Sequence, residues 1–97
     1  MGFNEKVYEL CKKIPKGKVT SYKEIAKSLK CKACRAVGNA LNKNPYAPIV
    51  PCHRVINSDG RLGGFALGLN SKIKLLKREG IEIRNNKIDL NKYFYKF

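Results

Sequence analysis

The chain has 97 residues, of which 43% are hydrophobic, and this length and composition predict one globular domain and exclude wholesale disorder. Its 21 lysines and arginines against seven acidic residues give a net charge of +14, which favours a polyanionic partner, most simply nucleic acid. No apolar run is long enough to span a membrane and no signal peptide is evident, so we expect a cytoplasmic protein with no membrane partner.

Three helices are predicted in the first half of the chain. Apolar residues recur at helical spacing over residues 3–13, which predicts an amphipathic helix there. After a break and a short extended link, residues 21–24 have the sequence SYKE, a capping box that opens a second helix. A third helix is predicted from about residue 33 to residue 43. Two short helices joined by a tight turn, in so basic a protein, indicate a helix-turn-helix.

Prolines and glycines are frequent in the middle of the chain. Three prolines between residues 45 and 51 predict a rigid, largely extended segment that leads to Cys52. The sequence NSDG at residues 57–60 predicts a turn, and the glycines within residues 63–68 predict a glycine-rich loop.

One more helix and a small hairpin are predicted near the end of the chain. The helix would begin at a capping Ser71 and end at Glu79, with Gly80 as its C-cap. Residues 81–89 alternate in polarity around Asn85-Asn86, which predicts the hairpin. The fold class expected is therefore mainly α with a small β component.

Residues 50–56 have the sequence VPCHRVI and place a thiol, an imidazole and a guanidinium side by side. These groups belong to Cys52, to His53, which is the one histidine of the chain, and to Arg54. An imidazole and a guanidinium are costly to bury unless they are paired, so a packed core has no use for this combination. Either the stretch lines a reactive site, or His53 and Arg54 face solvent.

Four cysteines raise the question of a metal site. In a protein without a signal peptide, Cys11, Cys31, Cys34 and Cys52 should be reduced thiols. Cys31 and Cys34 form a C-x-x-C motif, but a structural zinc needs four ligands. Cys11 and His53 are the plausible completions, and neither has standard spacing. We therefore expect incidental thiols and no metal.

The sequence PCHRV at residues 51–55 resembles the signature of the O6-alkylguanine-DNA alkyltransferases, the methylated-DNA–protein-cysteine methyltransferases. Five further stretches match this family in its order and spacing. They are GKVTSY at 17–22, RAVG at 35–38, NP at 44–45, LGGF at 62–65 and LLKREG at 75–80. The resemblance implies a single helix-turn-helix, winged-helix-like domain over residues 1–97, without the ribonuclease-H-like N-terminal domain usual in the family.

The activity that the resemblance implies is DNA repair by a protein that consumes itself. An alkyl group, such as methyl, would pass irreversibly from O6-alkylguanine in double-stranded DNA to a cysteine after the base is flipped out of the duplex. No cofactor is implied, and the protein would act as a monomer.

The chemistry of alkyl transfer gives the motif residues their implied roles. Attack on the alkyl carbon needs a soft nucleophile, which a thiolate provides, whereas a free thiol is mostly protonated at neutral pH. The resemblance implies that Cys52 accepts the alkyl group, that His53 is a base acting through a water, and that Glu79 orients the imidazole. It also implies that Asn44 braces the turn below the cysteine and that Tyr22 assists protonation of the leaving guanine. If residues 52 and 53 are extended, their side chains point to opposite sides and leave room for the water.

A second set of residues is implied in DNA binding. The second helix of the helix-turn-helix would enter the minor groove, where small residues permit a close approach. Arg35 would fill the space left by the flipped base, and Tyr22 would crowd the phosphate of the target nucleotide. The other residues implied in DNA contact are Thr20, Ser21, Ala33, Ala36 and Gly38.

The pocket for the alkylated base would be lined by Val55, Phe65, Ala66, Leu67 and Gly68. Phe65 stands where the family often has Tyr, whose hydroxyl can bind the guanine oxygen, so backbone N–H groups around Ala66 would carry more of this contact. Leu67 stands where some relatives have a smaller residue, so bulky adducts such as benzyl would fit poorly.

Two other functions remain open. The small size resembles that of alkyltransferase-like proteins, which bind alkylated guanine and flag it for another repair pathway. Their reactive cysteine is replaced, commonly by tryptophan, whereas this chain has Cys52. A plain helix-turn-helix regulator would explain the charge but would leave PCHRV and Glu79 without a role.

Overall fold

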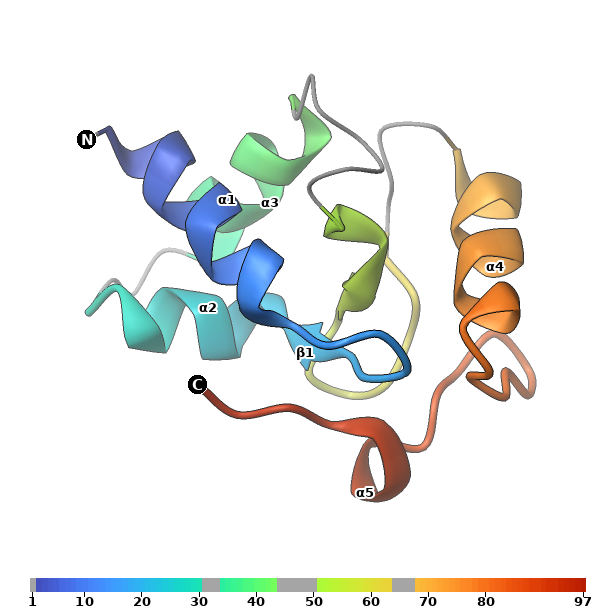
Figure 1. Cartoon of the computed structure of the whole chain (residues 1–97). Helices are drawn as coiled ribbons and strands as arrows, with labels where there is room; N and C mark the ends of the chain where they lie inside the picture. The colour runs from blue at the N-terminus through green and yellow to red at the C-terminus, as the bar shows by residue number, and fades with distance from the viewer. Residues whose placement is uncertain (1, 31–33, 44–50, 64–67) are drawn as a thin grey trace.

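The computed structural model describes residues 2–30, 34–43, 51–63 and 68–97, and the chain is mainly helical with a small two-stranded sheet, as predicted (Figure 1). Its helices and strands are α1 (Phe3–Lys13), β1 (Thr20–Ser21), α2 (Tyr22–Ser28), α3 (Cys34–Asn42), the short 3-10 helix η1 (Cys52–Arg54), β2 (Val55–Ile56), α4 (Leu69–Arg78) and α5 (Leu90–Tyr93). The predicted proline segment and most of the glycine-rich loop lie outside the described residues. None of the described helices is long and apolar enough to cross a membrane.

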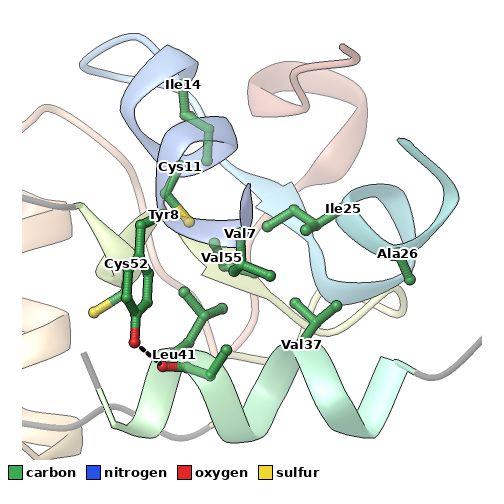
Figure 2. Close-up of a cluster of buried hydrophobic side chains, with 11 residues drawn as sticks. Val7, Tyr8, Cys11, Ile14, Ile25, Ala26, Val37, Leu41, Cys52 and Val55 are labelled. Carbon is green, nitrogen blue, oxygen red and sulfur yellow. Dashed lines mark hydrogen bonds between the residues drawn. The ribbon is translucent and has the colours of Figure 1, made fainter. Parts of the chain in front are cut away.

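The first three helices pack around one apolar cluster (Figure 2). The buried apolar residues of α1 recur at helical spacing. Val7 and Cys11 are fully buried, and Ile14 directly follows the helix on the same side. Tyr8 ties α1 to α3, since its hydroxyl donates to the carbonyl oxygen of Ala40 at 2.7 Å. Helix α1 therefore has the bounds that its apolar spacing predicts.

Helices α2 and α3 form the predicted helix-turn-helix pair. The hydroxyl oxygen of Ser21 accepts a hydrogen bond from the N–H of Glu24 at 3.0 Å, which is half of the predicted capping box. Helix α2 ends where Lys30 adopts a φ of 56°, a left-handed conformation that stops a helix. Ile25 and Ala26 of α2 are buried against α3 and α1.

A second apolar cluster joins residues of β2, α4 and α5. Its buried members are Val19, Ile56, Leu62, Leu76, Ile81, Ile88 and Tyr93. The chain from α5 onward runs beside Val19, whose N–H donates to the Tyr93 carbonyl (2.9 Å) and whose carbonyl accepts from the Tyr95 N–H (2.7 Å). Helix α5, which was not expected from the sequence, is a single turn that Asp89 caps by accepting from the N–H of Asn91.

Two local predictions need correction. Helix α4 begins earlier than predicted, after Gly68 rather than at a capping Ser71, because Gly68 has a φ of 94° that turns the chain into the helix. Asn85 and Asn86 do form a tight turn with φ of 52° and 58°. The flanking residues, however, pair through isolated bridges rather than through the strands of a hairpin.

Candidate active site

Residues 52–54 form a turn of 3-10 helix, whereas the sequence analysis expected residues 52 and 53 to be extended. The N–H of Arg54 donates to the Pro51 carbonyl at 3.0 Å, and the N–H of Val55 donates to the Cys52 carbonyl. Successive side chains of a 3-10 helix are about 120° apart, so the thiol, imidazole and guanidinium leave the turn in three directions. The room for a water between Cys52 and His53 therefore cannot come from an alternating strand.

The turn is fixed between the N-terminal helices and α4. It leads directly into β2, which pairs in parallel with β1 through Thr20–Val55 and Ser21–Ile56. Figure 1 shows η1 and β2 between the three N-terminal helices and α4, and η1 packs against both α1 and α4. Residues 52–56 are therefore part of the core rather than a surface loop.

Glu79, the C-cap residue of α4, binds the side chains of both His53 and Arg54. Nε2 of His53 lies 3.0 Å from Oε2 of Glu79. Arg54 binds the same carboxylate through two hydrogen bonds, from Nε to Oε1 at 2.9 Å and from Nη2 to Oε2 at 2.6 Å. Its third nitrogen, Nη1, donates to the Ile14 carbonyl. The side chains of His53, Arg54 and Glu79 are 3%, 16% and 10% exposed, so the three groups pair largely out of water.

The charges of this cluster define the tautomer of His53. Burial opposes ionisation of Glu79, but hydrogen bonds from Arg54 and His53 hold its pKa below the usual value. Burial lowers the pKa of His53 more than Glu79 raises it, so the imidazole is neutral at pH 7. An ionised carboxylate only accepts, so Nε2–H is the donor to Glu79 and the lone pair of the imidazole lies on Nδ1. His53 can therefore accept a proton at Nδ1.

Cys52 is 3% exposed and lies with Cys11 in the apolar cluster drawn in Figure 2. Burial raises the pKa of Cys11 to about 12, and the charge of Cys52 adds to this. Burial also raises the pKa of Tyr22 to about 12, with further contributions from Cys52 and Cys11. Cys11 and Tyr22 therefore stay protonated at neutral pH.

Some of the predicted DNA-binding residues meet at one surface. Tyr22, Arg35 and Gly38 line an open hollow of about 480 Å³ together with the turn at residues 57–59 and Lys23. Arg35 is exposed and Ala36 is half-buried on the same helix. This hollow lies between the start of α2 and α3, and three of the residues implied in DNA binding line it.

Other predicted residues are enclosed or not described. Thr20 is fully buried and its hydroxyl donates to the Tyr95 carbonyl at 3.0 Å, while the Ser21 hydroxyl caps α2. Val55 is buried next to the turn at residues 52–54, and Gly68 is exposed at the start of α4. Ala33, Asn44, Phe65, Ala66 and Leu67 lie outside the described residues.

No group of three His, Cys, Asp or Glu side chains that could hold a metal ion occurs within the part of the chain that the structure describes. Cys31 lies outside that part, so the C-x-x-C motif remains an untested feature of the sequence.

A comparison with protein families decides what kind of domain this is. The sequence profile of the family described as "6-O-methylguanine DNA methyltransferase, DNA binding domain" matches residues 2–81. The chain belongs to this family. Its similarity to named methyltransferases and to solved structures agrees with that assignment.

Curated methyltransferases are similar over most of the chain. A methylated-DNA–protein-cysteine methyltransferase of Methanosarcina acetivorans is 53% identical over 80% of this chain and 51% of its own length. A bifunctional methyltransferase/endonuclease of Picrophilus torridus is 47% identical over 90% of this chain and 30% of its own length. The chain thus spans about half or less of the length of these methyltransferases.

Solved methyltransferase-family structures share the fold. The structure of Mycobacterium tuberculosis OGT in complex with DNA has a TM-score of 0.78 and 45% identity, covering 81% of this chain and 50% of OGT. The structure of S. pombe Atl1 in complex with damaged DNA containing O6-carboxymethylguanine has a TM-score of 0.88 and 35% identity, covering 98% of this chain and 95% of Atl1.

Two charged residues of this methyltransferase-family domain were given no role by the sequence analysis. Arg54 was noted beside His53, but its three hydrogen bonds to Glu79 and Ile14 join residues 25 and 40 positions away. Lys72 is fully buried in α4. A signal for Lys72 does exist, because it precedes the buried Leu76 by four residues and therefore lies on the apolar face of the helix.

Proposed function

We propose that this domain repairs alkylated guanine in double-stranded DNA by moving the alkyl group from guanine O6 to the sulfur of Cys52. The observation that carries the proposal is the His53–Glu79 pair beside a buried cysteine. A neutral imidazole held by a carboxylate is suited to accept the proton of a thiol, and a regulator that only binds DNA has no use for such a pair. Membership of the 6-O-methylguanine DNA methyltransferase family supports the same function.

The proposed reaction is a displacement at the alkyl carbon. The thiol proton of Cys52 passes through a water to Nδ1 of His53, and the thiolate attacks the alkyl carbon. A carbon–sulfur bond forms, the bond between carbon and O6 breaks, and its electron pair stays with guanine. Tyr22 supplies a proton to the leaving guanine and is reprotonated, through solvent, by the proton that His53 took from Cys52. The net products are a thioether on Cys52 and unmodified guanine, so each chain reacts once.

The hollow between α2 and α3 is the proposed place of DNA. Helix α3 lies in the minor groove, Arg35 fills the stack from which the alkylguanine rotates, and Tyr22 crowds the adjacent phosphate. The net charge of +14 supplies the attraction to the phosphate backbone. One domain offers a complete set of these residues, so the proposed working form is a monomer.

Mass spectrometry tests this proposal directly. The chain is incubated with a duplex that contains one O6-methylguanine, and with the matched duplex that contains guanine. We expect the lesion duplex alone to add one methyl group per chain, located on the peptide that carries Cys52. A protein that binds the lesion but gains no mass would contradict the proposed transfer.

A second candidate function is recognition of alkylated guanine without transfer. The observation that favours it is the similarity to S. pombe Atl1 along nearly the whole of both chains, in a structure that holds DNA with O6-carboxymethylguanine. The same experiment separates the two functions. Tight, lesion-specific binding with an unchanged mass over many hours would select recognition, and one added methyl group would select repair.

A further inference from the structure

A second hollow adjoins the one in which we place the DNA. It has a volume of about 330 Å³ and lies between α2 and α5, and we call it the α5 hollow. Its lining includes Lys23, Lys27 and Ser58 on one side and Leu90, Asn91 and Phe94 on the other. Lys23 and Ser58 also line the hollow between α2 and α3, so the two hollows meet at these residues. A DNA strand that leaves the first hollow past Lys23 would enter the second.

The position of α5 is fixed by hydrogen bonds to the start of the sheet (Figure 1). The N–H of Val19 donates to the Tyr93 carbonyl at 2.9 Å, and the Val19 carbonyl accepts from the N–H of Tyr95 at 2.7 Å. The Thr20 hydroxyl donates to the Tyr95 carbonyl. Since β1 leads directly into α2, these bonds hold the two sides of the α5 hollow together. A ligand there would meet a preformed surface, and its binding would not require the ordering of a loop.

The groups that line the α5 hollow match the chemistry of a DNA backbone. Lys23 and Lys27 are exposed, so their ammonium groups can reach phosphate oxygens. The side-chain amide of Asn91, also exposed, can donate to a phosphate oxygen as well. Leu90 and Phe94 are half-buried and offer apolar surface to the deoxyribose rings between the phosphates.

The charge around the α5 hollow favours the same partner. Glu24 is the acidic member of the described lining, and it is half-buried, whereas both lysines of the lining are exposed. Lys18 adds another ammonium beside α5, because it donates to the Lys92 carbonyl at 3.4 Å. DNA bound in the neighbouring hollow would already hold its phosphates at the edge of this surface, so a contact here needs no separate association.

We propose that the α5 hollow binds the backbone of one DNA strand next to the minor groove that α3 enters, so that α5 extends the contact with the duplex. The inference rests on the place of DNA given under the proposed function, and it adds a partner surface to it. The match to the family profile ends at residue 81, before α5 begins. The contact is therefore a property of the C-terminal segment of this chain.

The first test is the salt dependence of binding to a guanine duplex, measured by fluorescence anisotropy on the full chain. We expect Lys27→Ala to lower the slope by about one unit and to weaken binding about fivefold to tenfold at 0.1 M salt, because one phosphate contact is lost. Asn91→Asp adds a negative charge without a change of size and should weaken binding by a similar factor. The matched controls are Lys77→Ala on α4 and Asn85→Asp in the turn after it, both at exposed positions. They should stay within about twofold of the wild type.

A scan with neutral phosphates locates the contact. Each duplex carries a single methylphosphonate in place of one phosphate, at successive positions along both strands. The position that meets Lys27 should weaken binding of the wild type and should have no further effect on Lys27→Ala, and the cycle of the two changes isolates their coupling. We expect this position to lie next to the one that couples to Lys23, because Lys23 lines both hollows.

Three results would overturn the proposal. Control values for both Lys27→Ala and Asn91→Asp would show that the DNA does not reach α5. Losses of equal size at every methylphosphonate position would show that Lys27 acts on the duplex only at a distance. A dimer that forms without DNA in sedimentation velocity, and that Asn91→Asp dissociates, would assign the α5 hollow to a second copy of the chain.

Failure of the proposed function has a different signature. These measurements follow binding alone, so a chain that gains no methyl group can still show the coupling of Lys27 to a phosphate. If DNA does not lie between α2 and α3, Lys23→Ala also stays at control values. If DNA lies there but stops short of α5, Lys23→Ala weakens binding and Lys27→Ala does not.

Discussion

Nε2 of His53 and Oε2 of Glu79 are 3.0 Å apart, although the two residues are 26 positions apart in the chain. Glu79 stands at the C-terminal end of α4, where a negative charge is unfavourable next to the helix dipole. Arg54 offsets this by binding both carboxylate oxygens. The imidazole therefore takes its orientation from the way α4 docks against η1, and a change at this contact should reach the thiol.

Replacing Glu79 with Gln tests that dependence. The amide keeps the size of the side chain but removes the charge that stabilises a protonated imidazole after proton transfer. We expect methyl transfer at pH 7 to slow by about tenfold or more and the free energy of unfolding to fall by about 1–3 kcal/mol, with the domain still folded. Single-turnover kinetics on the lesion duplex and urea unfolding measure the two effects.

The control for Glu79→Gln is Glu82→Gln, which changes an exposed glutamate a few residues further along the chain. It should leave both quantities at wild-type values. A Glu79→Gln variant with the wild-type rate would leave Cys52 as the nucleophile but would remove His53–Glu79 from its activation.

Cys52→Ala separates chemistry from recognition. Transfer should vanish, while lesion binding should survive within a few fold, because phosphate contacts and the flipped base supply most of the affinity. Intact mass and a binding titration on the same duplex measure both. Methyl transfer that persists in Cys52→Ala would move the acceptor to another thiol, against the raised pKa of the buried Cys11.

Arg35→Ala tests whether the exposed arginine of α3 acts on the duplex. If it fills the vacated stack, repair of a duplex should slow about tenfold or more, and transfer from free O6-methylguanine should not change. Lys23 lines the same hollow and serves as the comparison. If Lys23 only touches phosphate, Lys23→Ala should lower the salt dependence of binding by about one unit of slope. Equal losses on duplex and free base would assign Arg35 to the fold.

The stability of the domain should depend on pH through His53. Burial lowers the pKa of His53 in the folded state below its usual 6.5, so below pH 6.5 the unfolded chain binds the proton more readily than the folded chain. The contribution of His53 to the free energy of unfolding should therefore be constant well above pH 6.5 and should fall as the solution is acidified through pH 6.5. Urea unfolding between pH 5 and pH 7, below the range in which the buried Lys72 titrates, measures this slope. A flat profile would mean that His53 is protonated equally well in both states.

The local parts of the fold were predictable from the sequence. Helix α1 and the Ser21 cap follow from residues within one or two turns of one another, and Cys52, His53 and Glu79 stood out through motifs. The bond of Arg54 to Ile14 was not predictable, because it joins residues 40 positions apart. The same holds for Lys72, whose carbonyl partners lie 17 and 10 residues earlier. Such contacts arise only when segments that are far apart in the chain pack together.

The last residues of the chain are closer to the turn that carries Cys52 than their position in the sequence indicates. Tyr95 binds Val19 and Thr20, Thr20 pairs with Val55, and Val55 adjoins the turn that carries the thiol. A fusion partner or purification tag placed directly after Phe97 would disturb this series of contacts. Reporter fusions and immobilised forms of the domain should therefore be attached ahead of α1, where Gly2 and Phe3 are exposed.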